Sequence, residues 1–279
     1  VPGTTSDGSV QIGGSLPGDC NGDGVVDAGD ISACVLEIFD GDGSLAGDTP
    51  GGTFPGTPGC DSNQDGLVDA GDISCTVLLI FNGPGACGAA SSRPAGEPEA
   101  PTADRSTTPS EGPALAIPAQ VSAAPASSVA LPINFTAHGN GISSLIFSID
   151  YEDAWLSFDP TDSDGDGIPD SVVFNLPAGF NASVSFDATD TRGELDFLIA
   201  DTFPPLASLP DGALAVITLQ VGNAPQGSEL TVGFSNNPPP SFGTTTGQSI
   251  AGTTVDGSVL VGNCCDLNGD GQVNVVDIQ

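Results

Sequence analysis

Hydrophobic positions alternate with polar ones along much of the second half of the chain. Between residues 113 and 262, short stretches of this kind are separated by Gly, Pro and Asn. Alternation with a period of two, interrupted at such intervals, is typical of an antiparallel β-sandwich. The expected strands are SVALPINFTA (128–137), SSLIFSIDY (143–151), SVVFNL (171–176), ASVSFDA (182–188), GELDFLIA (193–200), GALAVITLQV (212–221), SELTVGFS (228–235) and GSVLVG (257–262).

Two apolar stretches nearer the N-terminus have a helical period instead. ISACVLEIFDG (31–41) and ISCTVLLIFNG (73–83) place apolar residues three and four positions apart. This spacing predicts two short helices, each with one apolar face. The residues of these faces are Ile31, Val35, Ile38 and Phe39 in the first helix and Ile73, Val77, Ile80 and Phe81 in the second.

A twelve-residue acidic loop precedes each predicted helix, and a third copy stands near the end of the sequence. They are DCNGDGVVDAGD (19–30), DSNQDGLVDAGD (61–72) and DLNGDGQVNVVD (266–277), named loop one, loop two and loop three. Each has Asp at positions 1, 5 and 12, Asn at 3, Gly at 6 and Asp or Asn at 9. This spacing surrounds one Ca²⁺ ion with oxygen ligands, and the Gly permits a sharp turn. Calcium is therefore the expected cofactor.

The order of loop and then helix differs from an EF-hand, which has a helix on both sides of its loop and Glu at position 12. Over about residues 17–88 the duplication resembles a type I dockerin, the calcium-dependent module of cellulosomal proteins, and 264–279 resembles the start of another. The resemblance implies a ligand set for each loop. The ligands are Asp19, Asn21, Asp23, Asp30, the Val25 carbonyl and Asp27 through water in loop one; Asp61, Asn63, Asp65, Asp72, the Leu67 carbonyl and Asp69 in loop two; and Asp266, Asn268, Asp270, Asp277 and the Gln272 carbonyl in loop three.

Positions 10 and 11 of loops one and two depart from the dockerin pattern. In dockerins these positions help to recognise the partner cohesin, whereas here they are Ala28-Gly29 and Ala70-Gly71. Ala and Gly offer almost no side chain. The sequence therefore argues against binding of a separate cohesin through this face.

The predicted sandwich carries a second resemblance. SSLIFSIDYEDAWLSFD, GELDFLIADTF, DGALAVITLQV and TTVDGSVLVG are similar to segments of a cohesin domain, a jelly-roll β-sandwich that shares its general architecture with some carbohydrate-binding modules. The expected fold class is therefore mainly β, with a small α calcium-binding module. Tyr151 and Trp155 are expected in the core of the sandwich.

A fourth acidic segment, DSDGDGIPD (162–170), lies between two predicted strands. Its acids reproduce the spacing of a thrombospondin type 3-like calcium loop. Position 12 is Val173, so the remaining ligands must come from elsewhere, with Asp159 as one candidate. The predicted ligands are Asp162, Asp164, Asp166 and Asp170.

The charge of the chain limits the classes of partner that it can bind. With 36 acidic residues against 3 Arg and no Lys, the net charge of −33 repels nucleic acid and anionic membrane surfaces. No run of about 18 apolar residues occurs, so no membrane insertion is expected. The sequence starts without Met or a signal peptide, which favours a processed protein or a piece of a longer one.

Seven cysteines lie mostly beside the acidic loops. The absence of a C-x-x-C pair and the presence of a single His leave little for a zinc site. Disulfides in an oxidising, extracellular compartment are the better interpretation, with connectivity open. The odd number suggests that one Cys near the C-terminus pairs beyond Gln279. The candidates are Cys20, Cys34, Cys60, Cys75, Cys87, Cys264 and Cys265, and the sequons add Asn134 and Asn181 as glycosylation candidates.

A repeat connects the two ends of the chain. TTSDGSVQIG (4–13) matches TTVDGSVLVG (253–262), and each is followed by an acidic loop. The N-terminal copy is expected to be either the last strand of a preceding sandwich or a donor strand for a neighbouring molecule. The expected organisation is 1–13 terminal strand, 14–90 dockerin-like module, 91–112 Pro/Ser/Thr-rich linker, 113–262 sandwich and 263–279 start of a next module.

These patterns support two functional hypotheses. The first is a secreted, calcium-stabilised structural protein that assembles with copies of itself into an extracellular filament or cell-surface rod. The alternative is a cohesin/dockerin-type adaptor or a carbohydrate-binding scaffold module, with a cohesin, a dockerin or a polysaccharide as partner. No catalytic motif is present, and His138 lies in a polar turn, so no enzyme activity is expected.

Overall fold

The computed structural model describes residues 16–39, 58–87, 111–186, 193–236 and 238–262. Two helices and a short 3₁₀ turn precede fourteen strands in the described part of the chain. The elements are α1 (Ala28–Phe39), η1 (Pro58–Cys60), α2 (Ala70–Asn82), β1 (Ala114–Ala116), β2 (Val121–Ala123), β3 (Ser128–Thr136), β4 (Ile142–Tyr151), β5 (Leu156–Phe158), β6 (Val172–Phe174), β7 (Phe180–Ser185), β8 (Glu194–Asp201), β9 (Gly212–Val221), β10 (Glu229–Phe234), β11 (Ser241–Thr244), β12 (Ser249–Ile250), β13 (Thr253–Val255) and β14 (Gly257–Val261).

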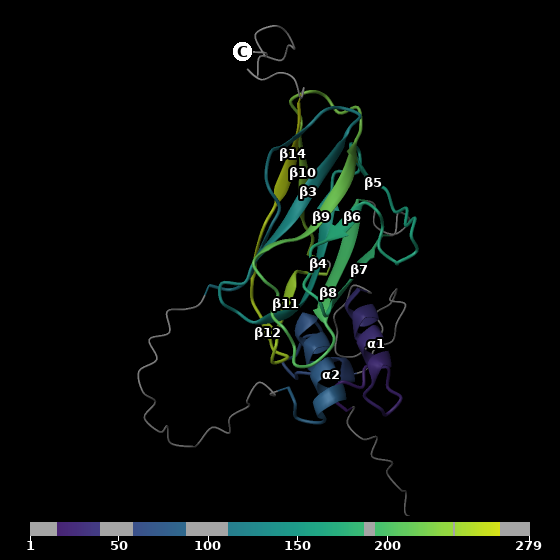
Figure 1. The fold of residues 1–279 in the computed structure, drawn as a ribbon, viewed down its shortest axis with the longest axis vertical. Coiled ribbons are helices and arrows are strands. Elements are labelled where there is room, and N and C mark those ends of the chain that lie inside the picture. The colour runs from purple at the N-terminus through teal and green to yellow at the C-terminus, as the bar shows by residue number, and fades with distance from the viewer. Residues whose placement is uncertain (1–15, 40–57, 88–110, 187–192, 237, 263–279) are drawn as a thin grey trace, which may run out of the picture.

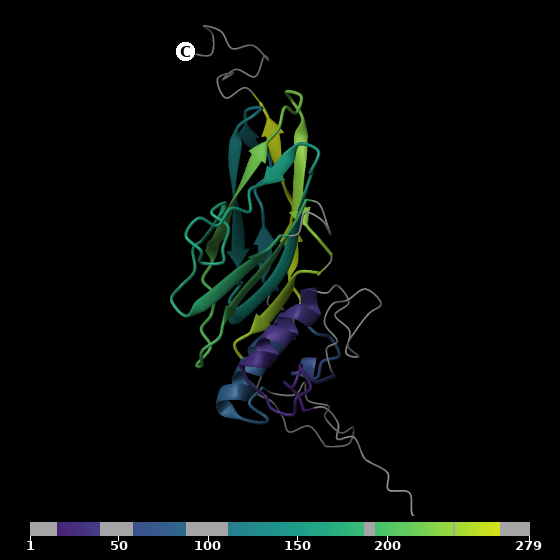
Figure 2. The ribbon, with the colours of Figure 1, turned by 90° about the vertical axis from the view of Figure 1, so that its right-hand side faces the viewer.

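The strands form two facing sheets (Figures 1 and 2). The first, named sheet A, has the order β13-β1-β3-β9-β5, with β6 also paired to β9. The second, named sheet B, has the order β12-β11-β4-β10-β14-β2, with β8 beside β4 and β7 beside β8. Pairs are antiparallel except β1 with β13 and β14 with β2. The chain is therefore mainly β, as its alternating pattern predicts.

The main core lies between the two sheets. Along β3, Val129, Leu131, Ile133 and Phe135 are buried while their neighbours are less so, which is the alternation of a strand with one solvated face. Phe147 in β4 stacks on Phe197 in β8 with ring centroids 4.9 Å apart. Burial of side chains of this size contributes about 1.5–3 kcal/mol each.

Strand β4 is buried on both faces, unlike β3. Leu145, Phe147 and Ile149 point into the core between the sheets. On the opposite face, Ser144 and Ile146 are fully buried because the helices cover them. Both views show α1 and α2 at one end of the sandwich, next to β8 and β11 (Figures 1 and 2). The part of the outer face of sheet B that lies under the helices is therefore an interface rather than a solvated surface.

Each of the eight predicted strands is present, with ends that differ by up to three residues. The sequence did not reveal β1, β2, β5, β11, β12 and β13, because strands of two to four residues carry too few positions to show alternation.

Both helices begin earlier than predicted, at Ala28 and Ala70. The physical reason is capping, since the Asp at loop position 9 accepts a hydrogen bond from a backbone N–H of the first turn. Asp69 accepts from Gly71 N at 2.7 Å, and Asp27 accepts from Gly29 N at 2.7 Å. None of the described helices is long and apolar enough to cross a membrane.

Candidate functional site

Loop two folds around its own carboxylates. Asp61 accepts hydrogen bonds from the backbone N–H groups of Asp65 and Gly66, at 3.1 and 3.2 Å. Asp72, at position 12, accepts from Asn63 N at 3.1 Å and from Asp69 N at 2.8 Å. The backbone of loop two therefore holds the side chains of positions 1 and 12 against the loop.

Loop one repeats this arrangement. Asp30, at position 12, accepts from Asn21 N at 3.0 Å and from Asp27 N at 2.8 Å. Asp19, at position 1, accepts from Gly24 N at 3.1 Å. The equivalence of the two loops in sequence thus extends to their hydrogen bonds.

Burial makes the negative charge of loop two costly. Asp30 and Asp72 are fully buried. Burial raises the pKa of Asp72 well above its usual range, and repulsion from Asp69 and Asp61 adds to this increase. Burial likewise raises the pKa of Asp69 and of Asp61. A group whose charged form is disfavoured in this way is stabilised by a nearby cation.

No basic side chain among the described residues supplies such a cation. The three Arg residues, Arg93, Arg105 and Arg192, all lie outside the described ranges, and the chain has no Lys. Loops one and two offer only carboxylate, amide and carbonyl oxygens, the donors that Ca²⁺ prefers. Their residues therefore fit calcium by donor chemistry and by charge.

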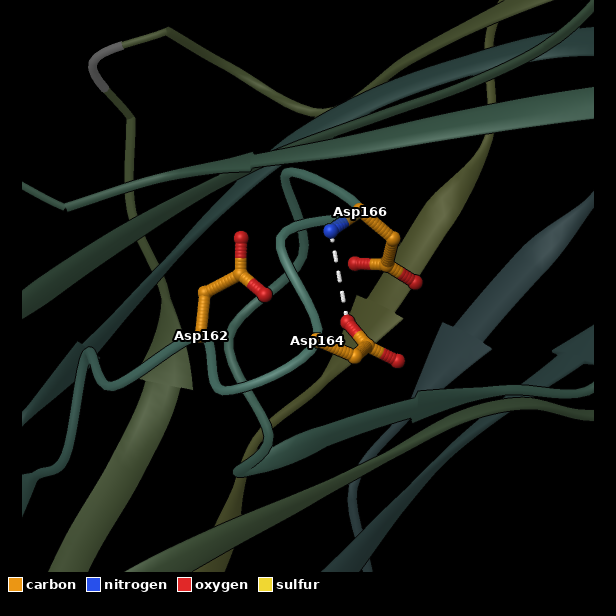
Figure 3. A group of neighbouring side chains, drawn as sticks. All are labelled: Asp162, Asp164 and Asp166. Carbon is orange, nitrogen blue, oxygen red and sulfur yellow. Dashed lines mark hydrogen bonds between the residues drawn. The ribbon is translucent and has the colours of Figure 1, made fainter.

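The acidic segment at 162–170 brings three of its predicted side chains together. The carboxylate oxygens of Asp162, Asp164 and Asp166 lie within 4.8 Å of one another (Figure 3). Asp162 accepts from Gly165 N and Gly167 N, at 2.8 and 2.9 Å, and these bonds lower its pKa. In the described part of the chain, the acids of loops one and two do not form a group as compact as this.

The other acids near this segment bond elsewhere. Asp170 accepts a hydrogen bond from Ser163 Oγ, and Asp159 accepts one from Thr161 Oγ1 at 2.6 Å. Both carboxylates are exposed. The predicted set is therefore brought together only in part. Loop three lies outside the described residues, and so do its predicted ligands Asp266, Asn268, Asp270, Gln272 and Asp277.

Two disulfides link the parts of the helical module. Cys20 pairs with Cys60, and Cys75 pairs with Cys87. Cys34 is a buried free thiol, so its assignment as a disulfide candidate is wrong. It faces the hydrophobic cluster between α1 and the sandwich, and burial raises its pKa well above the usual value. The remaining candidates, Cys264 and Cys265, lie outside the described residues.

Positions 10 and 11 of loop two contact the sandwich directly. Ala70 N donates to Ser241 Oγ at 3.2 Å, and the Ala70 carbonyl accepts from Ser144 Oγ. A Cβ added to Gly71 would lie 2.1 Å from Ser249 Oγ. The small residues that distinguish these positions from a dockerin are therefore required by close packing against the chain's own sandwich.

Hydroxyl groups continue this contact from α2 to β4. Ser74 Oγ lies 2.9 Å from Ser143 Oγ and 2.7 Å from Ser144 Oγ, and all three residues are buried. Sequence reasoning missed these serines because a Ser–Ser pair resembles an ordinary solvated position. Their only signal was a polar pair at the start of an otherwise apolar strand.

A single serine connects the sandwich to two predicted calcium ligands. Ser249 in β12 donates to Asp69 Oδ1 and accepts from Asn63 Nδ2 at 3.3 Å. These residues occupy positions 9 and 3 of loop two. Loop one makes no such contact with the sandwich at position 11. A Cβ added to Gly29, the equivalent of Gly71, would meet only Asp27 and Asn21 of its own loop.

Apolar contacts complete the interface. Ile146 and Ala200 of sheet B share a buried cluster with Cys34 and Ile38 of α1. Around α2, Phe81 meets Phe203 edge-on with ring centroids 5.4 Å apart. The loop after β8 adds an apolar contact to α2, because Leu206 packs against the cluster that contains Leu78 and Leu79.

A second cluster of acids lies on sheet B. Glu194 in β8 pairs in register with Asp150 in β4 and precedes Asp196 on the same strand. Burial, followed by repulsion from Asp196 and Asp150, raises the pKa of Glu194 from 4.5 to about 7. The protonated form is favoured here because the neighbouring charges have the same sign.

Other predicted residues have simple environments. Tyr151 is buried as expected, but Trp155 is 37% exposed, so its assignment to the core is wrong. It lies at the turn before β5 and not within a strand. Of the sequon residues, Asn181 is exposed and donates to Thr202 Oγ1 at 2.7 Å, whereas Asn134 is half-buried in β3.

Comparison with known proteins finds no matching protein-family model and no matching curated protein. Solved structures found to be similar are cohesin modules. The sixth cohesin of scaffoldin B from Acetivibrio cellulolyticus, solved in complex with a dockerin, is 26% identical, with 54% of this chain and 99% of that chain covered and a TM-score of 0.42. The seventh type I cohesin of ScaB from Pseudobacteroides cellulosolvens is 18% identical, with coverage of 56% and 96% and a TM-score of 0.42.

A third similar structure is a cohesin module of a family 33 glycoside hydrolase from Clostridium perfringens. It is 10% identical, with coverage of 54% and 96% and a TM-score of 0.39. All three are members of the family that the sandwich segments resemble. The mainly β architecture is shown by the strands and sheets themselves.

Proposed function

We propose that this chain is a non-catalytic binding module of the cohesin/dockerin type, in which a loop–helix pair docks on its own sandwich. The loop–helix pair comprises residues 16–39 and 58–87. The observation that carries the proposal is the seating of Ala70 and Gly71 against Ser144, Ser241 and Ser249. In dockerins these two positions help to recognise a cohesin, and here they contact a sandwich that resembles one.

Calcium belongs to this proposal as the cofactor of loops one and two. In each loop the residues at positions 1, 3, 5 and 12 would hold the ion, together with the position 7 carbonyl and the Asp at position 9. When bound, the ion would supply the positive charge that the buried carboxylates lack. The raised pKa of Asp72 and the absence of Lys and Arg among the described residues support this assignment.

The partner class follows from the same contacts. One of the similar cohesins is solved in complex with a dockerin, and a dockerin-like segment is the partner proposed for sheet B of this chain. A linear assembly of copies depends on residues 4–13 and 266–277, which lie outside the described residues, and no described contact supports it. The two disulfides favour an oxidising, extracellular location.

The test uses a substitution that blocks docking and a matched control. Gly71→Leu places a side chain where Ser249 stands, and Leu favours helix at this position more than Gly does. Calorimetry in calcium should show the loop–helix pair unfolding as a separate, earlier transition in this variant. Gly29→Leu makes the same change at the equivalent position of loop one, where the added side chain meets Asp27 and Asn21 of its own loop and no residue of the sandwich. In this variant the loop–helix pair should still unfold together with the sandwich, even if loop one itself is weakened. Identical unfolding of Gly71→Leu and wild type would refute docking.

A further inference from the structure

We infer that the docking face of the sandwich also accepts the loop–helix pair of a second copy of this chain. The docking face comprises Ser143, Ser144, Ile146, Ala200, Ser241 and Ser249. The inference rests on the proposed docking and adds that two molecules can exchange their loop–helix pairs. The occupant is a second copy because the segment that fits this face is part of the chain itself.

The interface is held without covalent bonds. Both disulfides of the described residues join parts of the loop–helix pair, Cys20 to Cys60 and Cys75 to Cys87, and neither crosses to the sandwich. The crossing hydrogen bonds join residues between 69 and 186 positions apart in sequence. An exchanged pair would reform every one of these contacts, so the contact energy is the same within one molecule and between two.

The connection between the two parts is a segment of 23 residues. Residues 88–110 connect Cys87 to Glu111, and four of these 23 residues are Pro. A Pro-rich segment of this length spans up to ~70 Å when extended, at ~3.1 Å per residue. Such a tether confers an effective concentration on the order of mM, so exchange becomes favourable at high local concentration or when docking within one molecule is blocked.

The composition of the face suits contact between two acidic molecules. Two chains of charge −33 repel each other, and this repulsion is screened within about 10 Å at 0.1 M salt. The residues of the docking face are uncharged Ser, Ile and Ala. Contact between copies therefore places no carboxylate of the face against the partner's loop–helix pair.

A complementation experiment with the full chain tests the exchange. Gly71→Leu damages only the loop–helix pair, and Ser144→Tyr damages only the face, where it meets the Ala70 carbonyl. Mixed in calcium at about 0.1 mM each, roughly tenfold below the effective concentration of the tether, the two variants retain one intact pair and one intact face between them. Light scattering after size exclusion should show a 1:1 heterodimer, and each variant alone should be monomeric.

The controls separate this inference from the proposed function. A double variant, Gly71→Leu with Ser144→Tyr, should form no heterodimer with Gly71→Leu, because that mixture contains no intact loop–helix pair. If both single variants lose docking by calorimetry yet their mixture stays monomeric, exchange is refuted and docking stands. If neither single variant loses docking, the proposed function fails and the inference fails with it. Ser249→Trp provides a second face variant should Ser144→Tyr fail to fold.

Discussion

Ser249 in β12 donates a hydrogen bond to Asp69, the residue at position 9 of loop two. The same hydroxyl accepts from Asn63 at position 3. Two predicted calcium ligands are therefore oriented by a residue of the sandwich that lies 180 and 186 positions away. Calcium binding in loop two and docking of the loop–helix pair on the sandwich share these residues. Docking should therefore strengthen calcium binding by the same factor by which calcium binding strengthens docking.

Replacement of this serine should weaken calcium binding in loop two. Asp69 and Asn63 then lose the hydroxyl that orients them, so Ser249→Ala should lower the affinity of that loop. A hydrogen bond to a charged group contributes about 1.5–3 kcal/mol, and because the bond also exists without the ion, the loss should be up to roughly tenfold. Calorimetric titration of the full chain measures the effect, and loop one serves as an internal reference. Ser183→Ala, at an exposed position in β7, should leave both affinities unchanged. Equal affinities in Ser249→Ala and wild type would contradict the coupling.

Two adjacent residues of β4 should affect different parts of the molecule. Ile146 faces the helices, so Ile146→Ala should weaken docking while the sandwich keeps its stability. Phe147 faces the core between the sheets, so Phe147→Ala should destabilise the sandwich by about 3–5 kcal/mol. Hydrogen exchange, measured at increasing denaturant concentration, gives the stability of the sandwich and that of the docked helices separately. Loss of sandwich stability in Ile146→Ala comparable to that in Phe147→Ala would show that the two faces are not independent.

The thiol of Cys34 should report whether the loop–helix pair is docked. It is fully buried in a cluster that contains Ile146 and Ala200 of the sandwich. In the wild type in calcium, labelling of Cys34 by a thiol reagent, located by mass spectrometry, should be slow. Gly71→Leu should accelerate it by an order of magnitude or more, and Gly29→Leu should not. Rapid labelling of the wild type would contradict the described burial.

Removal of calcium should loosen the helical module while the sandwich remains folded. Without a cation, the carboxylates of loop two are destabilised by burial and repel one another, as the raised pKa of Asp72 indicates. For a site whose Kd lies a hundredfold below the calcium concentration, binding adds ~2.7 kcal/mol to stability. Calorimetry with excess chelator should therefore shift the transition of the loop–helix pair downward and spare that of the sandwich. Unchanged transitions would count against calcium as the cofactor.

The stability of the sandwich should fall as the pH rises from about 4.5 to about 7. In this range the folded chain retains the proton of Glu194, whose pKa is about 7, while the unfolded chain loses it near 4.5. The folded state then binds more protons than the unfolded state, so stability decreases with increasing pH. Because Glu194 is only partly buried and solvent screens its charge, the effect should be ~1 kcal/mol or less. Glu194→Gln should remove this pH dependence, and Glu152→Gln, at an exposed position, should preserve it.

Much of the local structure could be predicted from the sequence. The alternation along 128–137 and 212–221 predicted β3 and β9, because a strand with one buried face must repeat every two residues. The Asp at positions 9 and 12 of loops one and two marked the helix starts that the apolar period alone placed three residues too late. The pairing of the cysteines could not be predicted, since Cys20 and Cys60 meet only when the two loops pack together.

The sequence by itself determined eight of the strands, both helices and the supply of oxygen ligands in the acidic loops, because these depend on residues that are close along the chain. Only the tertiary structure decided where the loop–helix pair lies. Ala70 and Gly71 looked like positions that had lost a binding surface, yet they lie against Ser144 and Ser249, far away in sequence. Small side chains allow any surface to come close, so the sequence does not say which surface does. The packing of α2 on sheet B decides that it is the chain's own sandwich.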